Sequence, residues 1–465
     1  NQTEMAVSIE VTSVAAYCER IEKPADVAKR LAGILALDPR LLARKLASDR
    51  SFVWIKRQAT PREVQRIKAL GIDGIAFIPE YNRFYPNKTL AAQVLGFTGI
   101  DGNGLEGIEF SYDSFLKGSE VQRTLLRDAL GQRYVAPGDT APDFNGKNIL
   151  LTLDRTIQYI SEKALEDAVE RYAAQSGIAI VMEPGSGAVL AMAHHPFFNP
   201  NAFKDFKRYN WRNRAITDPI EPGSTMKIFS AAAAVESGGS SPNTIFYCEN
   251  GSYRIGSKVI HDLGSYGWLS LQQIIKYSSN IGAIKISEML GPERLHATLR
   301  DFGFGAKTGI DCPGETTGSL SNPRRWTPMD TAAIAFGHGI AVSPLQLITA
   351  VSAIANNGAL MKPYLVKAVT DQNGQVLHTF EPTKVRQVVS DQTAATISKI
   401  METVISQGGT GTRAALDGYA VCGKTGTAQK LSKEGSYSED RYIASFVGYV
   451  PARNPVISVL VIINE

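Results

Sequence analysis

The sequence predicts an α+β fold, because strand-like segments stand at both ends of its longer part and helical segments lie between them. Two apolar runs flank a tight Gly-containing turn at 183–187 and predict a hairpin, and three further strand-like runs close the chain. These runs cover residues 176–182, 188–193, 419–429, 444–449 and 456–463. We therefore expect one sheet assembled from distant segments.

Length and composition predict a folded, multidomain protein. The 465 residues exceed the roughly 100 to 200 residues of one ordinary domain. Hydrophobic residues make up 44% of the chain and charged residues 20%, which is enough apolar material for packed cores. The formal charge of +4 is too small to indicate a nucleic-acid or membrane-surface partner. We expect no nucleic-acid partner.

The cysteines give no sign of a metal site. They are far apart and form no CxxC or Cys/His pattern, so we expect no metal site. Buried free thiols are the simplest expectation, although pairing in an oxidising compartment stays open. The four are Cys18, Cys248, Cys312 and Cys422.

A segment rich in turn formers, 136–146, predicts a domain boundary, with domains at 1–145 and 146–465. The first part mixes short strand-like runs with turns and one helical stretch at 24–46, and it carries no catalytic constellation. No run approaches the roughly 18 to 20 apolar residues that a membrane helix needs. We expect an excised ectodomain, because the chain opens without a signal segment and stops within an apolar run.

An amphipathic helix should follow the boundary and pack on the sheet. Thr152 and Asp154 offer capping oxygens at its start. Its expected apolar face consists of Ile157, Ile160, Ala164, Leu165 and Val169. Beyond the hairpin, helices are expected to about residue 410.

Ser224 and Lys227 stand at the start of a segment with strong helix-forming character. Positions i and i+3 share one face of a helix, so the amine should lie beside the hydroxyl, as a base beside a nucleophile. The helix N-terminus favours a nearby oxyanion, and base action requires a lysine that is desolvated or set among other cations. Alone, this SxxK pattern is common by chance, and a serine at a helix start is more often only a cap.

The second motif, Tyr277-Ser278-Ser279-Asn280, predicts a polar turn between helices at 269–276 and 281–290. The Ser278 hydroxyl can pass a proton between a lysine and a leaving amine, and the Asn280 amide can hold the lysine and a substrate backbone. By itself, such a turn is more often a capping structure.

The third motif, Lys424-Thr425-Gly426-Thr427, lies on the third predicted strand. Alternation places Lys424 and Gly426 on one face and both threonines on the other. Gly426 should let a peptide approach this edge as an added strand. The Thr427 N–H can face an oxyanion opposite the N–H of Ser224, and the lysine and threonine side chains can hold a carboxylate. The simpler interpretation is an edge strand that contains a glycine.

Together the motifs follow the order SxxK, SxN, KTGT, which is that of penicillin-binding proteins and class A β-lactamases. With them, the sequence resembles the class B penicillin-binding proteins, and among these the enzymes of cell division. Arg83-Phe-Tyr-Pro and Gly104-Leu-Glu-Gly107-Ile-Glu109 look like the box motifs of that family's non-catalytic pedestal. The resemblance implies an α+β transpeptidase domain with a central, mainly antiparallel sheet flanked by helices, and an elongated β-rich N-terminal pedestal. The family's last helix has no counterpart before Glu465.

The resemblance also implies a role for each motif residue, and it implies no metal or cofactor. Ser224 would be the nucleophile, Lys227 the general base, and Ser278 and Asn280 would relay the proton and position groups. Carboxylate, oxyanion and β-lactam binding would fall to Lys424, Thr425, Gly426 and Thr427.

The expected reaction is acyl transfer that cross-links peptidoglycan stem peptides during septal wall synthesis. Expected partners are a D-Ala-D-Ala donor, an amine acceptor, β-lactams and, through the pedestal, a membrane glycan polymerase with other division proteins. The expected location is the outer side of the cytoplasmic membrane. A D,D-carboxypeptidase and a β-lactam-binding sensor or scaffold remain alternatives. A class A β-lactamase is disfavoured, because no Glu-x-x-x-Asn lies between Asn280 and Lys424.

Overall fold

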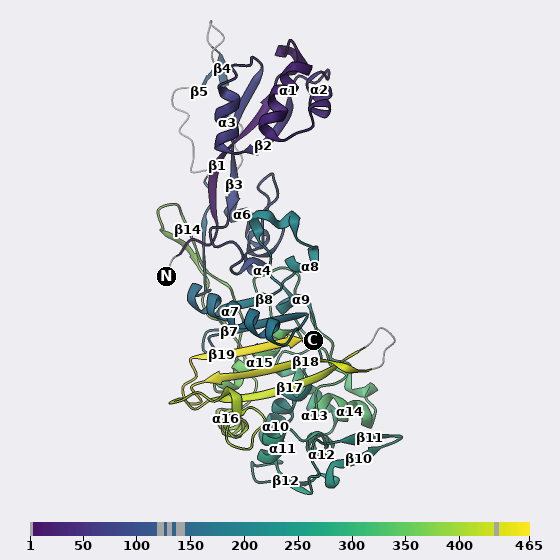
Figure 1. Cartoon of the computed structure of the whole chain (residues 1–465). Helices are drawn as coiled ribbons and strands as arrows, with labels where there is room; N and C mark the ends of the chain where they lie inside the picture. The colour runs from purple at the N-terminus through teal and green to yellow at the C-terminus, as the bar shows by residue number, and fades with distance from the viewer. Residues whose placement is uncertain (1–2, 119–124, 128–132, 136–144, 432–436) are drawn as a thin grey trace.

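The computed structural model describes residues 3–118, 125–127, 133–135, 145–431 and 437–465. The molecule is elongated, with a smaller N-terminal part at one end and a larger part around a five-stranded sheet at the other (Figure 1). The expected α+β fold is confirmed. Most of the turn-rich segment that we take as the domain boundary, 136–144, lies outside the described residues.

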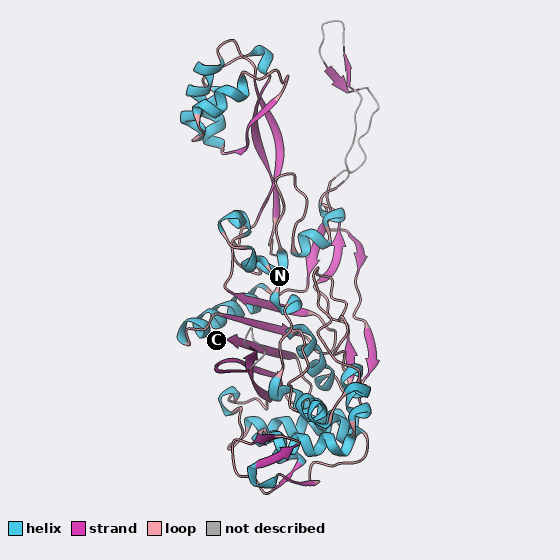
Figure 2. Cartoon of the chain, turned by 90° about the vertical axis from the view of Figure 1, so that its right-hand side faces the viewer, coloured by secondary structure: helices cyan, strands magenta, loops and turns pink. Residues whose placement is uncertain are grey.

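The N-terminal part is a three-stranded antiparallel sheet packed against helices. Its strand order is β2-β1-β3, and β1 pairs with both neighbours. Leu31, Leu35 and Val53 belong to its own apolar core. Figure 2 shows the long strands running from this helical head towards the larger part. The elements are β1 Val7–Ala16, α1 Pro24–Leu35, α2 Pro39–Leu46, β2 Val53–Ala59, α3 Pro61–Lys68 and β3 Ile75–Phe84.

The prediction of one helical stretch at 24–46 is wrong, because two helices, α1 and α2, occupy this segment. Helix α1 ends at Ala36, which has a left-handed φ of 54°. Asp38 then caps α2 by accepting the N–H groups of Arg40 at 2.7 Å and Leu41 at 3.2 Å. An Asp-Pro pair is a helix-start signal, and here it overrides the continuous apolar period.

Short helices join the two parts. They are α4 Ala92–Leu95, α5 Gly107–Ser111 and α6 Asp113–Leu116, and β4 Leu125–Arg127 pairs with β5 Arg133–Val135 farther along the chain. The buried Glu109 carboxylate accepts from Arg83 Nε at 2.7 Å. A Cβ at Gly96 would lie 1.8 Å from Glu106 O, so the backbones approach too closely there for any other residue. The segments that look like pedestal motifs thus pack on one another at the joint.

The larger part is built on the sheet that the sequence predicts. All neighbours in the order β17-β18-β19-β7-β8 are antiparallel, so the two ends of the domain meet where β19 pairs with β7. The strands are β7 Ser176–Met182, β8 Val189–His195, β17 Cys422–Leu431, β18 Tyr437–Val450 and β19 Ile457–Asn464.

Helices cover the sheet on both sides (Figures 1 and 2). Helix α7, Arg155–Arg171, begins at its cap Asp154, whereas Thr152 instead donates its hydroxyl to Val189 O at 2.7 Å. Its buried face is narrower than expected: Leu165 is buried, but Ile160 is 59% exposed. Behind the sheet lie α10 Lys227–Glu236, α15 Pro344–Ala355 and α16 Asp391–Ile405.

The segment expected to hold only helices also contains short strand pairs. The further helices are α8 Arg208–Trp211, α9 Arg214–Thr217, α11 Leu271–Tyr277, α12 Asn280–Leu290, α13 Pro292–Asp301 and α14 Pro328–Ala335. The strands are β9 Ile245–Tyr247, β10 Ser252–Ile255, β11 Lys258–His261, β12 Trp268–Ser270, β13 Ala359–Met361, β14 Val366–Thr370, β15 Val376–Thr379 and β16 Lys384–Gln387. They pair as β10-β11, β9-β12 and β13-β16, and β6 Asn148–Leu151 joins β14 and β15. The 3-10 turns are η1 Cys18–Arg20, η2 Pro200–Asp205, η3 Gly223–Met226, η4 Glu249–Gly251, η5 Pro323–Arg325 and η6 Thr412–Ala414. Strands three to five residues long carry little sequence periodicity, which is why they escape prediction.

All four cysteines are buried and unpaired, as expected. Within the described ranges, no helix is long and apolar enough to cross a membrane. Nor does the described part of the chain contain a group of three His, Cys, Asp or Glu side chains that could hold a metal ion.

Candidate active site

Ser224 lies in the 3-10 turn η3, which leads directly into α10. Side chains at i and i+3 lie on one side of a 3-10 turn, so this turn places Lys227 on the same side as Ser224, as the expected α-helix would. Gly223 has a φ of 55°, and a Cβ there would lie 2.7 Å from Thr427 O. Glycine is therefore required where the turn meets strand β17. Ser224 is partly exposed, and its hydroxyl bonds to no other described residue.

Lys227 is fully buried and held by the SxN turn. Its Nζ lies 2.6 Å from Ser278 O, 3.3 Å from Ser278 Oγ and 2.7 Å from Asn280 Oδ1. Burial, and secondly the charge of Lys424, lower the pKa of Lys227 well below its ordinary value, against an opposing effect of Asp262. An amine with a lowered pKa can be neutral near pH 7 and accept a proton.

The turn between α11 and α12 brings both functional groups of the second motif to the lysine. Ser278 ends α11 in the left-handed conformation, with φ 61°, and Ser279 caps α12 by accepting the Gly282 N–H at 2.8 Å. A non-glycine residue in this region is strained and has to be held by its surroundings. The strained turn points Ser278 Oγ between the two lysines, 3.0 Å from Lys424 Nζ.

Asp262 holds this turn from outside the motifs. Its carboxylate accepts the Ser279 hydroxyl at 2.5 Å, the Ile281 N–H at 3.1 Å and the Asn280 N–H. A carboxylate at a helix N-terminus also matches the helix dipole. The neighbouring His261 O accepts the Asn280 Nδ2 at 3.0 Å, which orients Oδ1 towards Lys227. No sequence pattern marks Asp262, because it lies 18 residues before Asn280.

Lys424 and its neighbours lie on β17, the edge strand of the sheet. Lys424 is fully buried, and burial lowers its pKa to about 7. Thr427 is exposed, and the Thr425 hydroxyl bonds the Thr410 hydroxyl at 2.9 Å. The predicted alternation agrees with this burial. The described atoms thus place an amine and two hydroxyl-bearing residues on one strand beside Ser224.

Gly426 also has a packing role that the sequence does not show. A Cβ there would lie 2.4 Å from Ser445 Oγ, 2.9 Å from Thr225 Cγ2 and 3.0 Å from Pro222 O. The missing side chain therefore makes room for the nucleophile turn, which packs against this strand, and the approach of a peptide to the strand edge stays a prediction.

A second loop fixes the nucleophile turn, and it also escapes sequence analysis. Gly223 N donates to Gly337 O at 3.1 Å. The Glu221 carboxylate accepts the Gly339 N–H at 2.9 Å and lies 3.2 Å from His338 Nδ1. The only sequence signal is the Gly-His-Gly run, which marks a tight turn without naming its partner.

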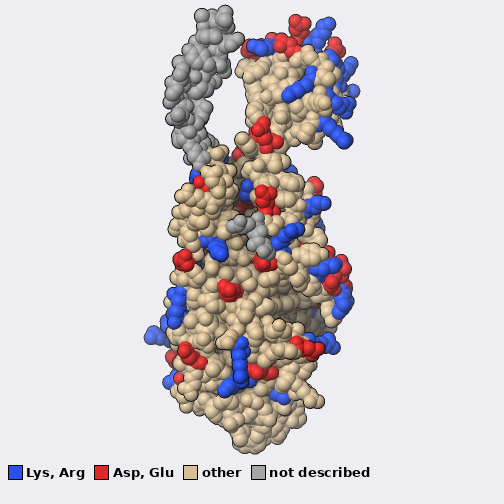
Figure 3. Space-filling view, turned by 90° about the vertical axis from the view of Figure 1, so that its left-hand side faces the viewer, with Lys and Arg blue, Asp and Glu red and all other residues tan. Residues whose placement is uncertain are grey.

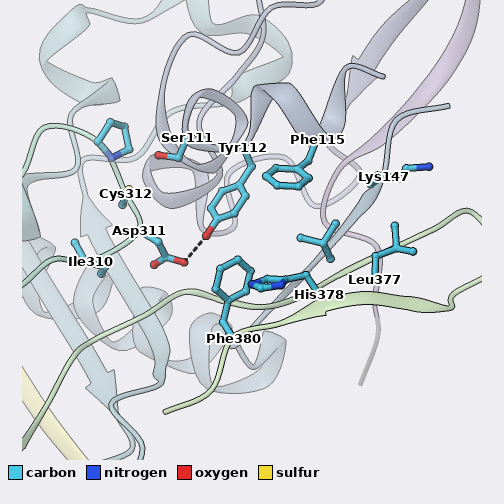
Figure 4. A pocket seen from close by; sticks show the side chains of 12 residues that line it. Ser111, Tyr112, Phe115, Lys147, Ile310, Asp311, Cys312, Leu377, His378 and Phe380 are labelled. Carbon is cyan, nitrogen blue, oxygen red and sulfur yellow. Dashed lines mark hydrogen bonds between the residues drawn. The ribbon is translucent and has the colours of Figure 1, made fainter. Parts of the chain in front are cut away.

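A cavity of about 760 Å³ lies away from these residues, at the joint between the two parts (Figure 4). Tyr112 and Phe115 from the N-terminal part face His378 and Phe380, and the Tyr112 hydroxyl donates to Asp311 at 3.1 Å. The cavity contains none of the motif residues. Its size alone does not make it the active site, because the two buried lysines and the hydroxyl that joins them lie elsewhere.

Sequence comparison decides the family. The sequence model of the penicillin-binding protein transpeptidase domain matches residues 177–465, and that of the penicillin-binding protein dimerisation domain matches residues 1–151. The chain belongs to the penicillin-binding protein transpeptidases. The enzyme class that the motifs predict, a peptidoglycan D,D-transpeptidase, is confirmed.

Relatives align over almost the whole chain. The transpeptidase is 35% identical to the probable peptidoglycan D,D-transpeptidase PenA of Neisseria meningitidis, over 100% of this chain and 78% of that protein. It is 31% identical to the peptidoglycan D,D-transpeptidase FtsI of Escherichia coli, over 99% of this chain and 77% of that protein. It is 34% identical to the stage V sporulation protein D of Bacillus subtilis, over 100% of this chain and 73% of that protein.

A solved structure shares the fold. Penicillin binding protein 3 from Mycobacterium tuberculosis, complexed with aztreonam, superposes with a TM-score of 0.74 at 31% identity, covering 83% of this chain and 85% of that one.

Proposed function

We propose that Ser224 carries the acyl group during transpeptidation and that Lys227 is its general base. The observation that supports this most directly is the pair of buried lysines joined through one hydroxyl, with Ser278 Oγ 3.3 Å from Lys227 Nζ and 3.0 Å from Lys424 Nζ. Two buried cations disfavour each other's protonated forms, so the pair supplies a neutral amine beside the nucleophile.

The reaction proceeds in two balanced halves. Neutral Lys227 takes the proton of Ser224 as Oγ bonds to the penultimate D-alanyl carbonyl, and the N–H groups of Ser224 and Thr427 face the developing oxyanion. The amide C–N bond then breaks, and the proton returns through Ser278 to the D-alanine amine that leaves. In the second half an acceptor amine attacks the ester and gives one proton to Lys227. The C–Oγ bond then breaks, and Lys227 passes that proton to Ser224 Oγ.

The strand β17 is the proposed carboxylate site. Lys424 supplies positive charge when protonated, and Thr425 and Thr427 supply hydroxyl donors for the terminal carboxylate of the donor peptide or of a β-lactam. We extend β-lactam acylation to this chain from the likeness to solved relatives that are complexed with aztreonam and with ampicillin. Asn280 positions Lys227 and the substrate backbone.

We assign the reaction to septal wall synthesis, on the resemblance of the sequence motifs to those of the division enzymes. The same proposal divides the chain into a pedestal at 1–145 and a transpeptidase domain at 146–465. It places the transpeptidase domain on the periplasmic side of the cytoplasmic membrane. The pedestal then docks a membrane glycan polymerase and other division proteins.

Ser224→Ala tests the nucleophile. Covalent labelling by a fluorescent penicillin should disappear while the melting temperature changes little, because Ser224 is partly exposed and a hydroxyl at a helix start contributes at most about 0.5 to 2 kcal/mol. Ser237→Ala, at the far end of α10, is the matched control and should label normally. Labelling that survives in Ser224→Ala would exclude this serine.

Product analysis separates the alternatives. With a stem-peptide donor and an added amine, a transpeptidase forms the cross-linked product and releases D-alanine. A carboxypeptidase releases D-alanine without the cross-link, and a sensor does neither.

A further inference from the structure

Strands β9 and β12 form a two-stranded ribbon with an exposed aromatic face. Trp268 is 69% exposed and pairs across the ribbon with Tyr247, their ring centroids 5.0 Å apart and the rings tilted by 44°. Ile245, on the same side of β9 as Tyr247, is 61% exposed. A contiguous patch of solvent-exposed apolar and aromatic side chains marks an interaction site more often than single scattered apolar residues do. We call Ile245, Tyr247 and Trp268 the aromatic face.

The ribbon adjoins the SxN turn. Cys248 N donates to Gly267 O at 2.6 Å, which closes the ribbon beside Trp268. On its inner side, Cys248 Sγ lies 3.8 Å from Ser279 Oγ, between Ser278 and Asn280 of the motif. The ribbon therefore packs directly against the turn that carries Ser278 and Asn280.

The ribbon also occupies the end of the molecule farthest from the N-terminal part (Figure 1). This end is almost entirely free of Lys, Arg, Asp and Glu side chains on the face shown in Figure 3. Glu249, which follows the ribbon, is neutralised by Lys285 at 3.0 Å. The exposed side chains of the aromatic face, Ile245 and Trp268, are themselves uncharged, which suits an uncharged ligand.

Amide groups complement the rings. Asn250 Nδ2 donates to the Tyr247 hydroxyl at 2.9 Å, and a Cβ at Gly267 would lie 3.4 Å from Asn250 Oδ1, so the amide lies beside the Trp268 backbone. Aromatic rings stack on the C–H faces of pyranose sugars, and amides bond to sugar hydroxyl and acetamido groups. In a peptide-substituted glycan strand the lactyl carboxylate is consumed in the amide to the peptide, which leaves the sugar backbone uncharged.

We propose that the aromatic face binds the glycan strand whose stem peptide enters the cleft at Ser224. This inference rests on the proposed transpeptidase function, since it names the polymer that carries the donor peptide. Holding the strand turns capture of the next stem peptide into an intramolecular event, which raises its effective concentration at Ser224.

Titration with soluble, uncross-linked glycan strands that keep their stem peptides tests the proposal, because their lactyl groups stay amidated. The protein is first acylated by penicillin, so that the cleft is blocked, and isothermal calorimetry is the readout. Trp268→Ala should weaken binding by roughly three- to tenfold, the range expected for one lost ring contact. Trp268→Phe keeps a ring and should recover part of the loss. Tyr159→Ala removes a ring that is 62% exposed on α7 and should bind like the parent protein.

Penicillin acylation of Ser224, measured on the same proteins, separates the two proposals. Normal acylation without glycan binding in the parent protein overturns the glycan site and leaves the proposed function standing. Equal binding by the parent and Trp268→Ala also overturns the site. If Trp268→Ala instead changes the sedimentation of the protein alone, the face is a contact between copies and the glycan proposal is wrong. Failure of acylation in the parent would count against the proposed function.

Discussion

Replacing Lys424 by methionine should make the folded enzyme more stable while it removes the charge from the carboxylate site. Lys424 is fully buried, and its amine has two hydrogen-bond partners, Ser278 Oγ and Thr425 O at 2.9 Å. An ammonium group in such a place loses more hydration than two neutral oxygens replace. Methionine has a similar length and no charge to desolvate.

The magnitude follows from the pKa. Lowering the pKa of Lys424 from 10.5 to about 7 corresponds to about 5 kcal/mol, at roughly 1.4 kcal/mol per pH unit. The variant also loses two hydrogen bonds, and each loss lowers the free energy of unfolding by about 1 kcal/mol. The variant should therefore unfold with a free energy about 3 kcal/mol higher than the parent at pH 7.

The pH dependence provides the sharper test. Between pH 7 and about 10 the unfolded chain holds the Lys424 proton and the folded chain does not, so the parent gains stability as the pH rises. The difference in free energy of unfolding between Lys424→Met and the parent should accordingly be largest at pH 7 and below. Above pH 7 it should shrink by about 1.4 kcal/mol per pH unit. Urea unfolding at pH 7, 8 and 9, followed by tryptophan fluorescence, measures this difference. Lys399→Met, at an exposed position of α16, is the matched control. Parallel curves for parent and Lys424→Met across this range would refute the depressed pKa.

Three further outcomes test the remaining parts of the site. Lys227→Arg keeps the charge but cannot release a proton, so the rate of penicillin acylation should fall by roughly 10² to 10⁴-fold, and a near-normal rate would exclude a base role. Asp262→Asn keeps the shape but accepts fewer hydrogen bonds; the melting temperature should drop and acylation should slow, which thermal melts and stopped-flow acylation follow together. Unchanged acylation in a destabilised Asp262→Asn protein would confine Asp262 to a structural role. Gly426→Ala should lower both stability and acylation, because its Cβ would lie 2.4 Å from Ser445 Oγ; activity at parental level would mean that the strand can shift away from the nucleophile turn.

Local spacing in the sequence predicts those features of the candidate site that lie within one turn or one strand. The two residues between Ser224 and Lys227 place them on one face of any helical turn, whether it is 3-10 or α. Strand alternation likewise separates Lys424 from Thr425. The central sheet was predictable for the same reason, since each of its strands is long enough to show an apolar pattern of its own.

The missed features depend on contacts between distant segments. Asp262 reaches Asn280 across 18 residues, and Glu221 reaches Gly339 across 118. Neither spacing corresponds to a helical or strand period, so no local pattern reveals the contact. For Gly426 the residue type is visible in the sequence, but its packing partner is not. The glycine was noticed, but only the fold shows that the nucleophile turn occupies the space beside it.

The three oxygen atoms around Lys227 Nζ suit both protonation states of the amine. Two of its three neighbours, Ser278 O at 2.6 Å and Asn280 Oδ1 at 2.7 Å, can only accept hydrogens from it. A neutral amine has two N–H groups and satisfies both, and its lone pair is then left for the remaining direction. An ammonium group keeps the same two bonds and uses its third N–H there. The lysine can therefore gain or lose a proton while every surrounding heavy atom stays in place, so reorganisation adds little to the barrier of the transfer.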